Sequence, residues 1–506
     1  MKKIIMVLCL VLVLVLMVTI FVACDNTDSE GNAIDTLVVY NWEDYIDESA
    51  ETSRIEAFKE YYKEVTGNSI DIVYSTFDTN ETMLAKVLNN DASSVDLICP
   101  SDYAIQKLMV NDRLESLTSL INQYKDELDL KNIKFGTLQN TELDFSEAIR
   151  HEFSEIEING QIVSMEDYMV PYMMGTLGIL YNVNYVTQED LDAGWGILWN
   201  KAGNPDLENK ILVKDSVRDT YVAAVMYMRQ EGLLPDGYEN KTVQELINCT
   251  DSALLKAAED VLTEQRDHIA GYEVDFGKDD MLNEIVYVDL AWSGDALWAI
   301  EESYDEETGE YYLDYFVPRD ENNRQTGNIW FDGWVIPKTA SNKKAALLFI
   351  DFMNDPNNAI YNSIYIGYTS AVSTERMMFE FDDDNHIIYQ DGHPNEKGYE
   401  VINETVYEIL LDNEYAEEGD EYDFSYFDDE RRYPTKDEFG TNELGVMRDF
   451  GDRTEAAITM WENAKTGKDV PWVLIYCTAA LLGLAVVILI IWGIKEKIRL
   501  QPKKIN

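Results

Sequence analysis

Aromatic and acidic residues stand close together at several points of the chain, and such side chains together can hold an organic cation. The first group is Trp42, Asp44 and Tyr45, directly after the apolar, β-branched run of residues 37–40. The face of an aromatic ring and a carboxylate both attract positive charge, and the ring also covers methylene groups. This group therefore indicates a site for a cation with an apolar body, unless Trp42 and Tyr45 simply pack into the core.

Three later groups repeat this combination of side chains. They contain Ser101 and Tyr103, then Trp292 and Asp295, then Trp330 and Asp332, and Asp219 stands on a polar turn between the first two. Each group follows a short apolar run that is typical of a strand. In open α/β sheets, ligands bind at the carboxyl ends of the strands. Four groups at strand ends therefore favour one shared site over core packing.

The elements that would position these groups alternate between strands and helices. Strand patterns cover residues 69–75, 95–99, 176–182, 210–213, 286–291 and 328–337, and helical patterns cover 80–89, 103–108, 221–231 and 343–352. The pair Asn159 and Gly160 predicts a tight hairpin within residues 156–163. Repeated strand–turn–helix units predict an α/β fold with mainly parallel sheets.

Composition narrows the class of partner. The chain has 506 residues, and its 95 acidic residues against 40 basic ones give a formal net charge of −55. This charge disfavours binding to nucleic acid and favours cationic partners, although for most of the acids solubility is a sufficient explanation. No cofactor or metal site is expected, because the chain has four His and no Cys/His spacing typical of zinc ligands.

Cysteine is equally sparse. Three of the five Cys lie in or beside the apolar end segments, which leaves Cys99 and Cys249 in the body of the protein. Two cysteines exclude a disulfide framework, and whether they form a single bridge stays open.

The N-terminal residues 1–24 have the pattern of a signal peptide, since Lys2 and Lys3 precede an apolar run over residues 4–23. Residues 21–24 resemble a bacterial lipobox, in which Cys24 would be lipidated and become the mature N-terminus. Cleavage without a lipid and an uncleaved anchor are the alternatives. The polar residues 25–35 are interpreted as a tether.

A second apolar segment lies near the other end, at residues 471–494. At about 1.5 Å per residue it is long enough to span a bilayer as a transmembrane helix. The basic tail of residues 495–506 places that end in the cytoplasm, and the lysines before the first apolar run place its start there too. The body between the two segments is therefore expected at the cell membrane, on its extracytoplasmic side.

Seven stretches in order along the chain resemble the extracytoplasmic polyamine-binding proteins of ABC transporters, which take putrescine or spermidine. These stretches are residues 40–45, 75–83, 96–103, 170–172, 292–295, 330–332 and 366–368. The resemblance implies the two-lobed α/β clamshell of the type II periplasmic binding proteins. It also implies a cleft lined by Trp42, Asp44, Tyr45, Ser101, Tyr103, Asp219, Trp292, Asp295, Trp330, Asp332 and Tyr368.

The same resemblance predicts how the chain divides between the lobes. The first lobe would comprise residues 36–172 and 332–372, and the second residues 173–331 and 373–466. The acidic stretch 379–440 is longer than the family pattern. It is interpreted as a solvated insertion in the second lobe, with a cation-binding loop as the alternative.

The function implied is that of a membrane-tethered solute-binding protein, which captures a polyamine by hinge closure and delivers it to an ABC permease. Asp44 and Asp295 match the putrescine type, and Ser216 stands where spermidine-type members have an acid, so putrescine is the expected preference. A polyamine-sensing ectodomain is the alternative, although the short basic tail carries no signalling domain. Catalysis is not expected, because the sequence has no nucleophile–base motif, phosphate loop or metal triad.

Overall fold

The computed structural model describes residues 34–49, 53–89, 95–133, 153–154, 156–158, 160–380, 387, 402–417, 422–434 and 442–466. The predicted signal segment with Cys24, the predicted membrane-spanning segment 471–494 and the basic tail 495–506 lie outside these ranges. Within the described ranges, no helix is both long enough and apolar enough to cross a membrane.

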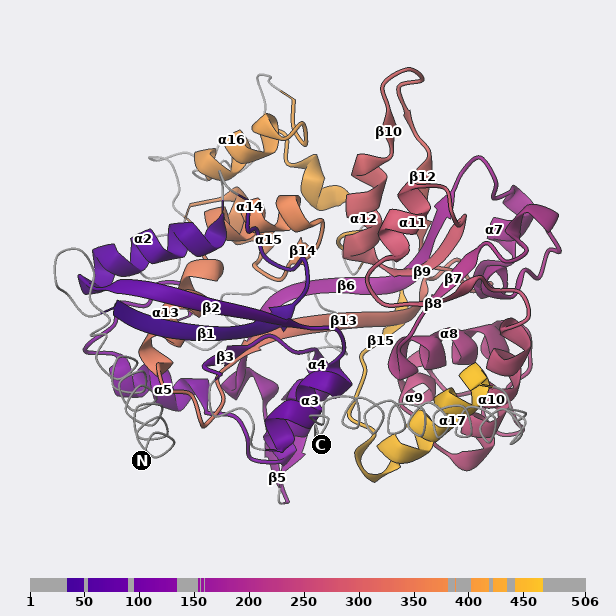
Figure 1. Cartoon of the computed structure of the whole chain (residues 1–506), viewed down its shortest axis with the longest axis horizontal. Helices are drawn as coiled ribbons and strands as arrows, with labels where there is room; N and C mark the ends of the chain where they lie inside the picture. Colours follow the sequence, from indigo (N-terminus) through magenta and orange to yellow (C-terminus); the bar gives the residue numbers. More distant parts are fainter. Residues whose placement is uncertain are drawn as a thin grey trace, which may run out of the picture.

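One eleven-stranded sheet runs through the whole molecule in the order β2-β1-β3-β13-β6-β9-β7-β8, with β12 and β14 paired to β6 and β15 paired to β13 (Figure 1). The strands are β1 (Ile34–Trp42), β2 (Ser69–Phe77), β3 (Leu97–Ile98), β6 (Met169–Asn182), β7 (Ile211–Lys214), β8 (Gly271–Glu273), β9 (Val288–Trp292), β12 (Leu313–Phe316), β13 (Thr326–Val335), β14 (Thr369–Ser370) and β15 (Glu443–Gly445). Two separate hairpins pair β4 (Ile156–Ile158) with β5 (Gln161–Val163) and β10 (Tyr304–Asp305) with β11 (Glu310–Tyr311).

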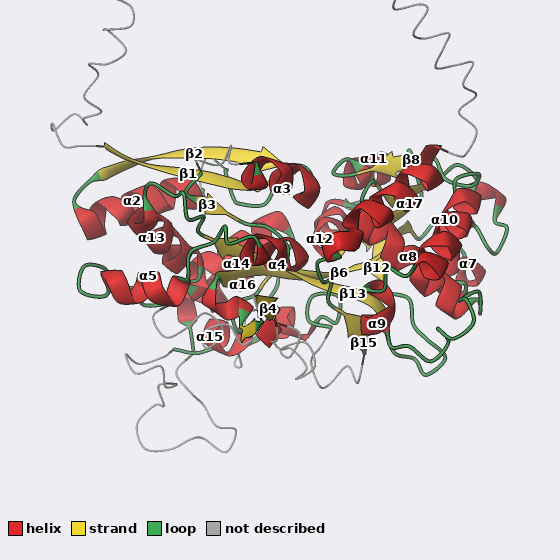
Figure 2. Cartoon of the chain, turned by 90° about the horizontal axis from the view of Figure 1, so that it is seen from below, coloured by secondary structure: helices red, strands yellow, loops and turns green. Residues whose placement is uncertain are grey.

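Strands β6 and β13 join the two halves of the molecule. They pair antiparallel with each other and are almost completely buried. On one side β13 also pairs with β3, and on the other side β6 also pairs with β9 and β12. Figures 1 and 2 show the two strands crossing the centre between two groups of helices, so the fold is a two-lobed one.

Helices cover both lobes. The first lobe carries α2 (Arg54–Thr66), α3 (Asn80–Leu88), α4 (Asp102–Val110), α5 (Leu117–Tyr124), α13 (Lys343–Met353) and α14 (Pro356–Ile366). The second carries α7 (Gln188–Asp192), α8 (Val217–Gln230), α9 (Val243–Ile247), α10 (Ser252–Gln265), α11 (Gly277–Leu282), α12 (Ser293–Glu302) and α17 (Thr454–Thr466). Leu37, Trp334 and Phe349 belong to the apolar cluster of the first lobe, and Leu212 and Leu297 to one in the second. Each lobe therefore has a buried cluster of its own, and a further cluster that includes Ile98 and Val222 extends through both lobes.

The sheet is mixed, which differs from the mainly parallel one expected. The pairs β1–β2, β1–β3, β7–β8 and β7–β9 are parallel, as predicted. The joining strands β6 and β13 instead form antiparallel pairs with each other and with the neighbours β9 and β3. A fully buried strand is apolar on both faces whichever way it runs, so the pattern of its residues does not reveal its direction.

Strand β6 also begins earlier than the predicted residue 176. Its start includes Pro171, which removes a hydrogen-bond donor and therefore argues against a central strand. The ladder with β13 shifts register between Asp332 and Gly333, opposite this proline. Such a β-bulge tolerates a proline and redirects nearby side chains, here at a residue that sequence analysis assigned to the site.

Helix α8 begins before the predicted residue 221 and takes in part of the polar stretch that was expected to be a turn. Ser216 is its N-cap, and the Ser216 hydroxyl accepts a hydrogen bond from the Asp219 amide at 3.3 Å. A serine followed three residues later by an acid is typical of a helix start. Asp219 therefore lies in the first turn of a helix.

Part of the chain assigned to the second lobe lies beside the first. Helices α15 (Thr374–Met378) and α16 (Glu404–Asp412) contact α14. The Arg376 guanidinium also donates to Asn132 Oδ1 at 3.0 Å. Helix α17 packs on α10 in the second lobe, and the other lobe boundaries stay predictions. The two body cysteines, Cys99 and Cys249, are both free thiols.

Candidate ligand-binding site

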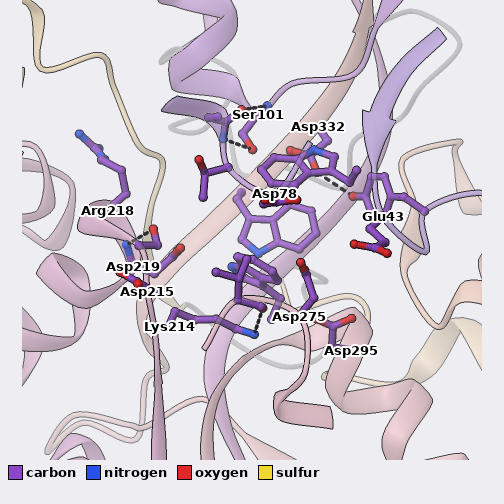
Figure 3. Close-up of a pocket in the computed structure, with 18 of the residues that line it drawn as sticks. Glu43, Asp78, Ser101, Lys214, Asp215, Arg218, Asp219, Asp275, Asp295 and Asp332 are labelled. Carbon is purple, nitrogen blue, oxygen red and sulfur yellow. Dashed lines mark hydrogen bonds between the residues drawn. The ribbon is translucent and has the colours of Figure 1, made fainter. Parts of the chain in front are cut away.

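A cavity between the lobes gathers all eleven residues that the sequence analysis singled out. The first lobe and the joining strand contribute Trp42, Asp44, Tyr45, Ser101, Tyr103, Trp330, Asp332 and Tyr368, and the second lobe contributes Asp219, Trp292 and Asp295. Figure 3 shows side chains of both lobes around this cavity. The predicted groups thus surround one site, although Trp330 and Asp332 lie within β13, beside its bulge, and not at its end. The contact of each residue with a ligand stays a prediction.

Helix starts position three of these polar side chains. Ser101 is the N-cap residue of α4, and Asp219 and Asp295 lie in the first turns of α8 and α12. The unpaired amides and the dipole at a helix start favour a carboxylate there. This placement holds Asp219 and Asp295 at the cavity although each is only 7% exposed.

The turn after β1 separates two residues that are adjacent in sequence. Asp44 adopts a left-handed conformation with a φ of 48°, which Asp tolerates better than most residues. The chain therefore reverses sharply at Asp44, whose side chain is 71% exposed at the mouth of the cavity. Tyr45 returns to the interior, where it is 3% exposed.

Asp332 is a buried carboxylate with unused hydrogen-bonding capacity. The Tyr45 hydroxyl donates to Asp332 Oδ2 at 2.7 Å, but Oδ1 has no hydrogen-bond partner among the described residues. Burial raises the pKa of Asp332 to about 7, and hydrogen bonds from Ser101 and Tyr45 offset only part of that effect. A buried acceptor without a partner is costly, so Asp332 is a position at which a ligand donor would be strongly favoured.

Aromatic rings line the space next to Asp332. The ring centres of Trp42 and Trp292 lie 6.3 Å apart across the lobes, and those of Trp330 and Tyr368 lie 5.8 Å apart. Within the described part of the chain, the indole nitrogens of Trp42 and Trp330 have no hydrogen-bond partner. These rings provide an apolar, electron-rich wall of the kind that covers methylene groups beside a cation.

Three basic residues that the sequence analysis did not single out also line the cavity: Lys214, Arg218 and Lys278. Lys214 is buried, with its Nζ 2.5 Å from Glu273 Oε1 and 4.3 Å from the centre of the Trp292 ring. The Arg218 guanidinium lies 3.5 Å from the centre of the Phe450 ring. These cations are already engaged by the protein's own acids and rings.

A sequence signal existed for one of these residues. Lys214 is the last residue of the buried strand β7, close to the kind of position that the singled-out acids occupy, so a charged residue there could have been included. Lys278 stands in a Gly-Lys-Asp-Asp stretch, and only the folded chain brings it to the cavity.

Acids dominate the charge of the site. Of the described residues that line the cavity, eleven are acidic and three are basic. Glu43, Asp78 and Asp275 bring carboxylate oxygens within 4.8 Å of one another, and the first two are exposed. Repulsion among so many carboxylates disfavours an anionic ligand and favours a cation.

Comparison with known proteins agrees with this architecture. The profile of a family described as bacterial extracellular solute-binding protein matches residues 55–386. A spermidine/putrescine-binding periplasmic protein of Salmonella typhimurium is 25% identical over 365 residues, which cover 72% of this chain and 86% of that protein. A putrescine-binding periplasmic protein of Pseudomonas aeruginosa is 26% identical over 325 residues, covering 63% of this chain and 74% of that protein.

Solved structures show the same fold. A Listeria monocytogenes protein described as a spermidine/putrescine ABC transporter superimposes with a TM-score of 0.56 and 25% identity, covering 85% of this chain and 99% of that one. The alignment spans nearly the whole of that protein, so the two lobes described above correspond to a complete known structure.

Proposed function

Because the chain belongs to the bacterial extracellular solute-binding protein family, we propose that it captures a polyamine between its lobes and delivers it to an ABC permease. The single observation that carries the proposal is the buried Asp332, whose Oδ1 lacks a partner among the described residues at an aromatic-lined cavity. The family comprises substrate-binding transport proteins, so the chain is not an enzyme.

The names of the relatives support a polyamine as the ligand class. The proteins compared above are described as binding spermidine and putrescine or putrescine alone, and each aligns over most of its own length. Those names describe binding, and the Listeria monocytogenes structure is described as an ABC transporter. The alternative of a polyamine-sensing ectodomain finds no support in them.

The eleven residues singled out from the sequence are proposed as the ligand-binding set. Asp332 and Asp219 would hold the inner ammonium, and Trp42, Trp292 and Trp330 would cover the methylene chain. Asp44 and Asp295 would face the outer ammonium. Putrescine is the proposed preference, because the spermidine type has an acid where Ser216 stands in this chain.

The interaction energies suffice for such a ligand. An ammonium held by a carboxylate contributes on the order of 1.5–3 kcal/mol, and each ring-face contact contributes roughly 0.5–2 kcal/mol. Burial of four methylene groups adds about 3 kcal/mol. Micromolar binding requires about 8 kcal/mol after the costs of ordering. One carboxylate at each end and an aromatic wall therefore reach that range.

Putrescine titration of the full chain, purified in detergent and followed by isothermal titration calorimetry at pH 8 and pH 6, tests this proposal. An ammonium needs Asp332 ionised, and burial raises the pKa of this carboxyl to about 7. Lowering the pH from 8 to 6 protonates most of Asp332, so we expect putrescine affinity to fall about tenfold. Equal affinities at the two pH values would contradict the assignment of Asp332.

We also propose that the protein is tethered to the membrane with its body on the extracytoplasmic side. The support is the lipobox-like run ending at Cys24 and the apolar segment 471–494, followed by a basic tail. Mass spectrometry of the mature N-terminus should find a diacylglyceryl group on Cys24. A mature chain that begins at another residue would leave the segment 471–494 as the proposed anchor.

A further inference from the structure

Lys278 lies across the outer end of the cavity, between the two lobes. It stands on α11, and its Nζ lies 3.1 Å from Asp44 Oδ2 and 3.4 Å from Asp295 Oδ1. Asp44 belongs to the first lobe and Asp295 to the second. These are the two carboxylates that matched the putrescine-type pattern, so the protein's own ammonium occupies the place assigned to an outer ammonium.

The surroundings of Lys278 keep it charged and in place. Its side chain is 13% exposed, and its Nζ lies 5.5 Å from the centre of the Trp298 ring. Although burial lowers the pKa of Lys278, the carboxylates of Asp295 and Asp44 outweigh this effect and raise the pKa above its usual value. A cation between two carboxylates and beside a ring satisfies the same preferences as a ligand ammonium.

We propose that Lys278 is a specificity-determining residue, whose ammonium competes with the second ammonium of a polyamine for Asp44 and Asp295. The proposal rests on the polyamine-binding function proposed above and deepens it. The inner carboxylates remain available to any alkylammonium group. The outer pair becomes available only when Lys278 moves away.

This competition reduces the advantage of a diamine over a monoamine. At the outer end, the second ammonium of putrescine only takes the place of the Lys278 ammonium. The net gain in binding free energy there is therefore small. Removing the lysine charge leaves two carboxylates without their cation, and the second ammonium of putrescine then gains its full contact. A charge-assisted contact of this kind corresponds to about a ten- to hundredfold change in affinity.

Calorimetric titration of the full chain with putrescine and with n-butylamine tests the proposal. Lys278→Met should raise the ratio of putrescine affinity to n-butylamine affinity by about tenfold or more. Lys278→Arg keeps the charge and should keep the ratio of the unaltered protein. Lys256→Met removes a surface lysine of the same lobe on α10, outside the cavity, and should leave the ratio unchanged. If Lys278→Met does not fold, Lys278→Gln provides the same test.

The titrations distinguish the role of Lys278 from polyamine binding itself. An unchanged ratio in Lys278→Met, with putrescine still bound by the unaltered protein, would overturn the role of Lys278 and leave polyamine binding intact. A fall in the affinity for both amines by one common factor would likewise overturn it, because it would show a structural clasp between the lobes. Failure of the unaltered protein and of every variant to bind either amine would overturn the function itself.

Discussion

Replacing Asp332 with Asn should weaken putrescine binding at pH 8 by about thirtyfold or more, since losing one partner of a buried charge pair costs roughly 2–5 kcal/mol. Asparagine keeps the shape of the side chain and an oxygen that accepts the Tyr45 hydroxyl, whose present distance to Asp332 Oδ2 is 2.7 Å. It removes only the charge that the ligand ammonium would meet. Calorimetric titration of the two proteins measures the difference.

Asp71→Asn is the matched control, because Asp71 is an exposed acid on β2 of the first lobe. Its loss should change affinity less than about twofold, as is usual for exposed positions. The Asp332→Asn protein should also lose most of the pH dependence expected between pH 6 and 8. Binding of putrescine by Asp332→Asn as tightly as by the unaltered protein would show that Asp332 holds no ammonium.

The same substitution has a predictable effect on stability. Burial raises the pKa of Asp332 in the folded protein to about 7, above the value of 3.8 expected without the fold. A raised carboxyl pKa means that the folded state binds the proton more tightly than the unfolded state. The contribution of Asp332 to stability is therefore lost as the pH rises through this range. At pH 8 the Asp332→Asn protein should consequently unfold at a higher temperature than the unaltered one.

Replacing Lys214 with Met should lower the free energy of unfolding by about 3–5 kcal/mol, which is typical of breaking a buried ion pair on one side. Lys214 and Glu273 are 2% and 0% exposed at their side chains, and the Lys214 ammonium also donates to the Val274 carbonyl at 2.9 Å. Although burial lowers the pKa of Lys214, the carboxylates of Glu273 and Asp289 outweigh it and keep the lysine charged. Urea unfolding at pH 8 measures the loss.

A double variant and a measurement at lower pH test whether the stability loss in Lys214→Met comes from the broken ion pair. Glu273→Gln added to Lys214→Met should recover part of the lost stability, because it removes one of the carboxylates left without a cation. The decrease in the free energy of unfolding caused by Lys214→Met should also be smaller at pH 5, because the carboxyls that have lost the lysine bind protons there in the folded state. A Lys214→Met protein as stable as the unaltered one at pH 8 would show that Lys214 and Glu273 do not form a buried ion pair that matters for stability.

Much of the candidate site could be predicted from sequence because its acids and rings follow apolar strands directly. Trp42 ends β1 and Trp292 ends β9, so a pattern of strand ends singled out both residues. The two strands run in opposite directions, and the fold brings their carboxyl ends to the cavity between the lobes. The direction of β6 and β13 could not be predicted in this way, because a buried strand has the same composition in either direction.

The cations of the site escaped prediction for a different reason. Lys278 reaches Asp44 across a sequence separation of 234 residues, and no local pattern encodes a contact between two lobes. The contacts of α15 and α16 with α14 escaped prediction for the same reason, since they depend on tertiary packing. Periodicity and strand ends report on local structure, whereas charge pairing across the cleft is set by the folded chain.

Polyamine binding itself is tested most directly by calorimetric titration of the full chain at pH 8 with putrescine, spermidine and glutamate in turn. We expect putrescine to bind with a Kd of about a micromolar or below, and at least as tightly as spermidine. Glutamate should produce no binding heat, because its carboxylates would add negative charge to a cavity that eleven acidic residues of the described ranges already line. Absence of binding by both polyamines, or tighter binding of glutamate than of putrescine, would contradict the account.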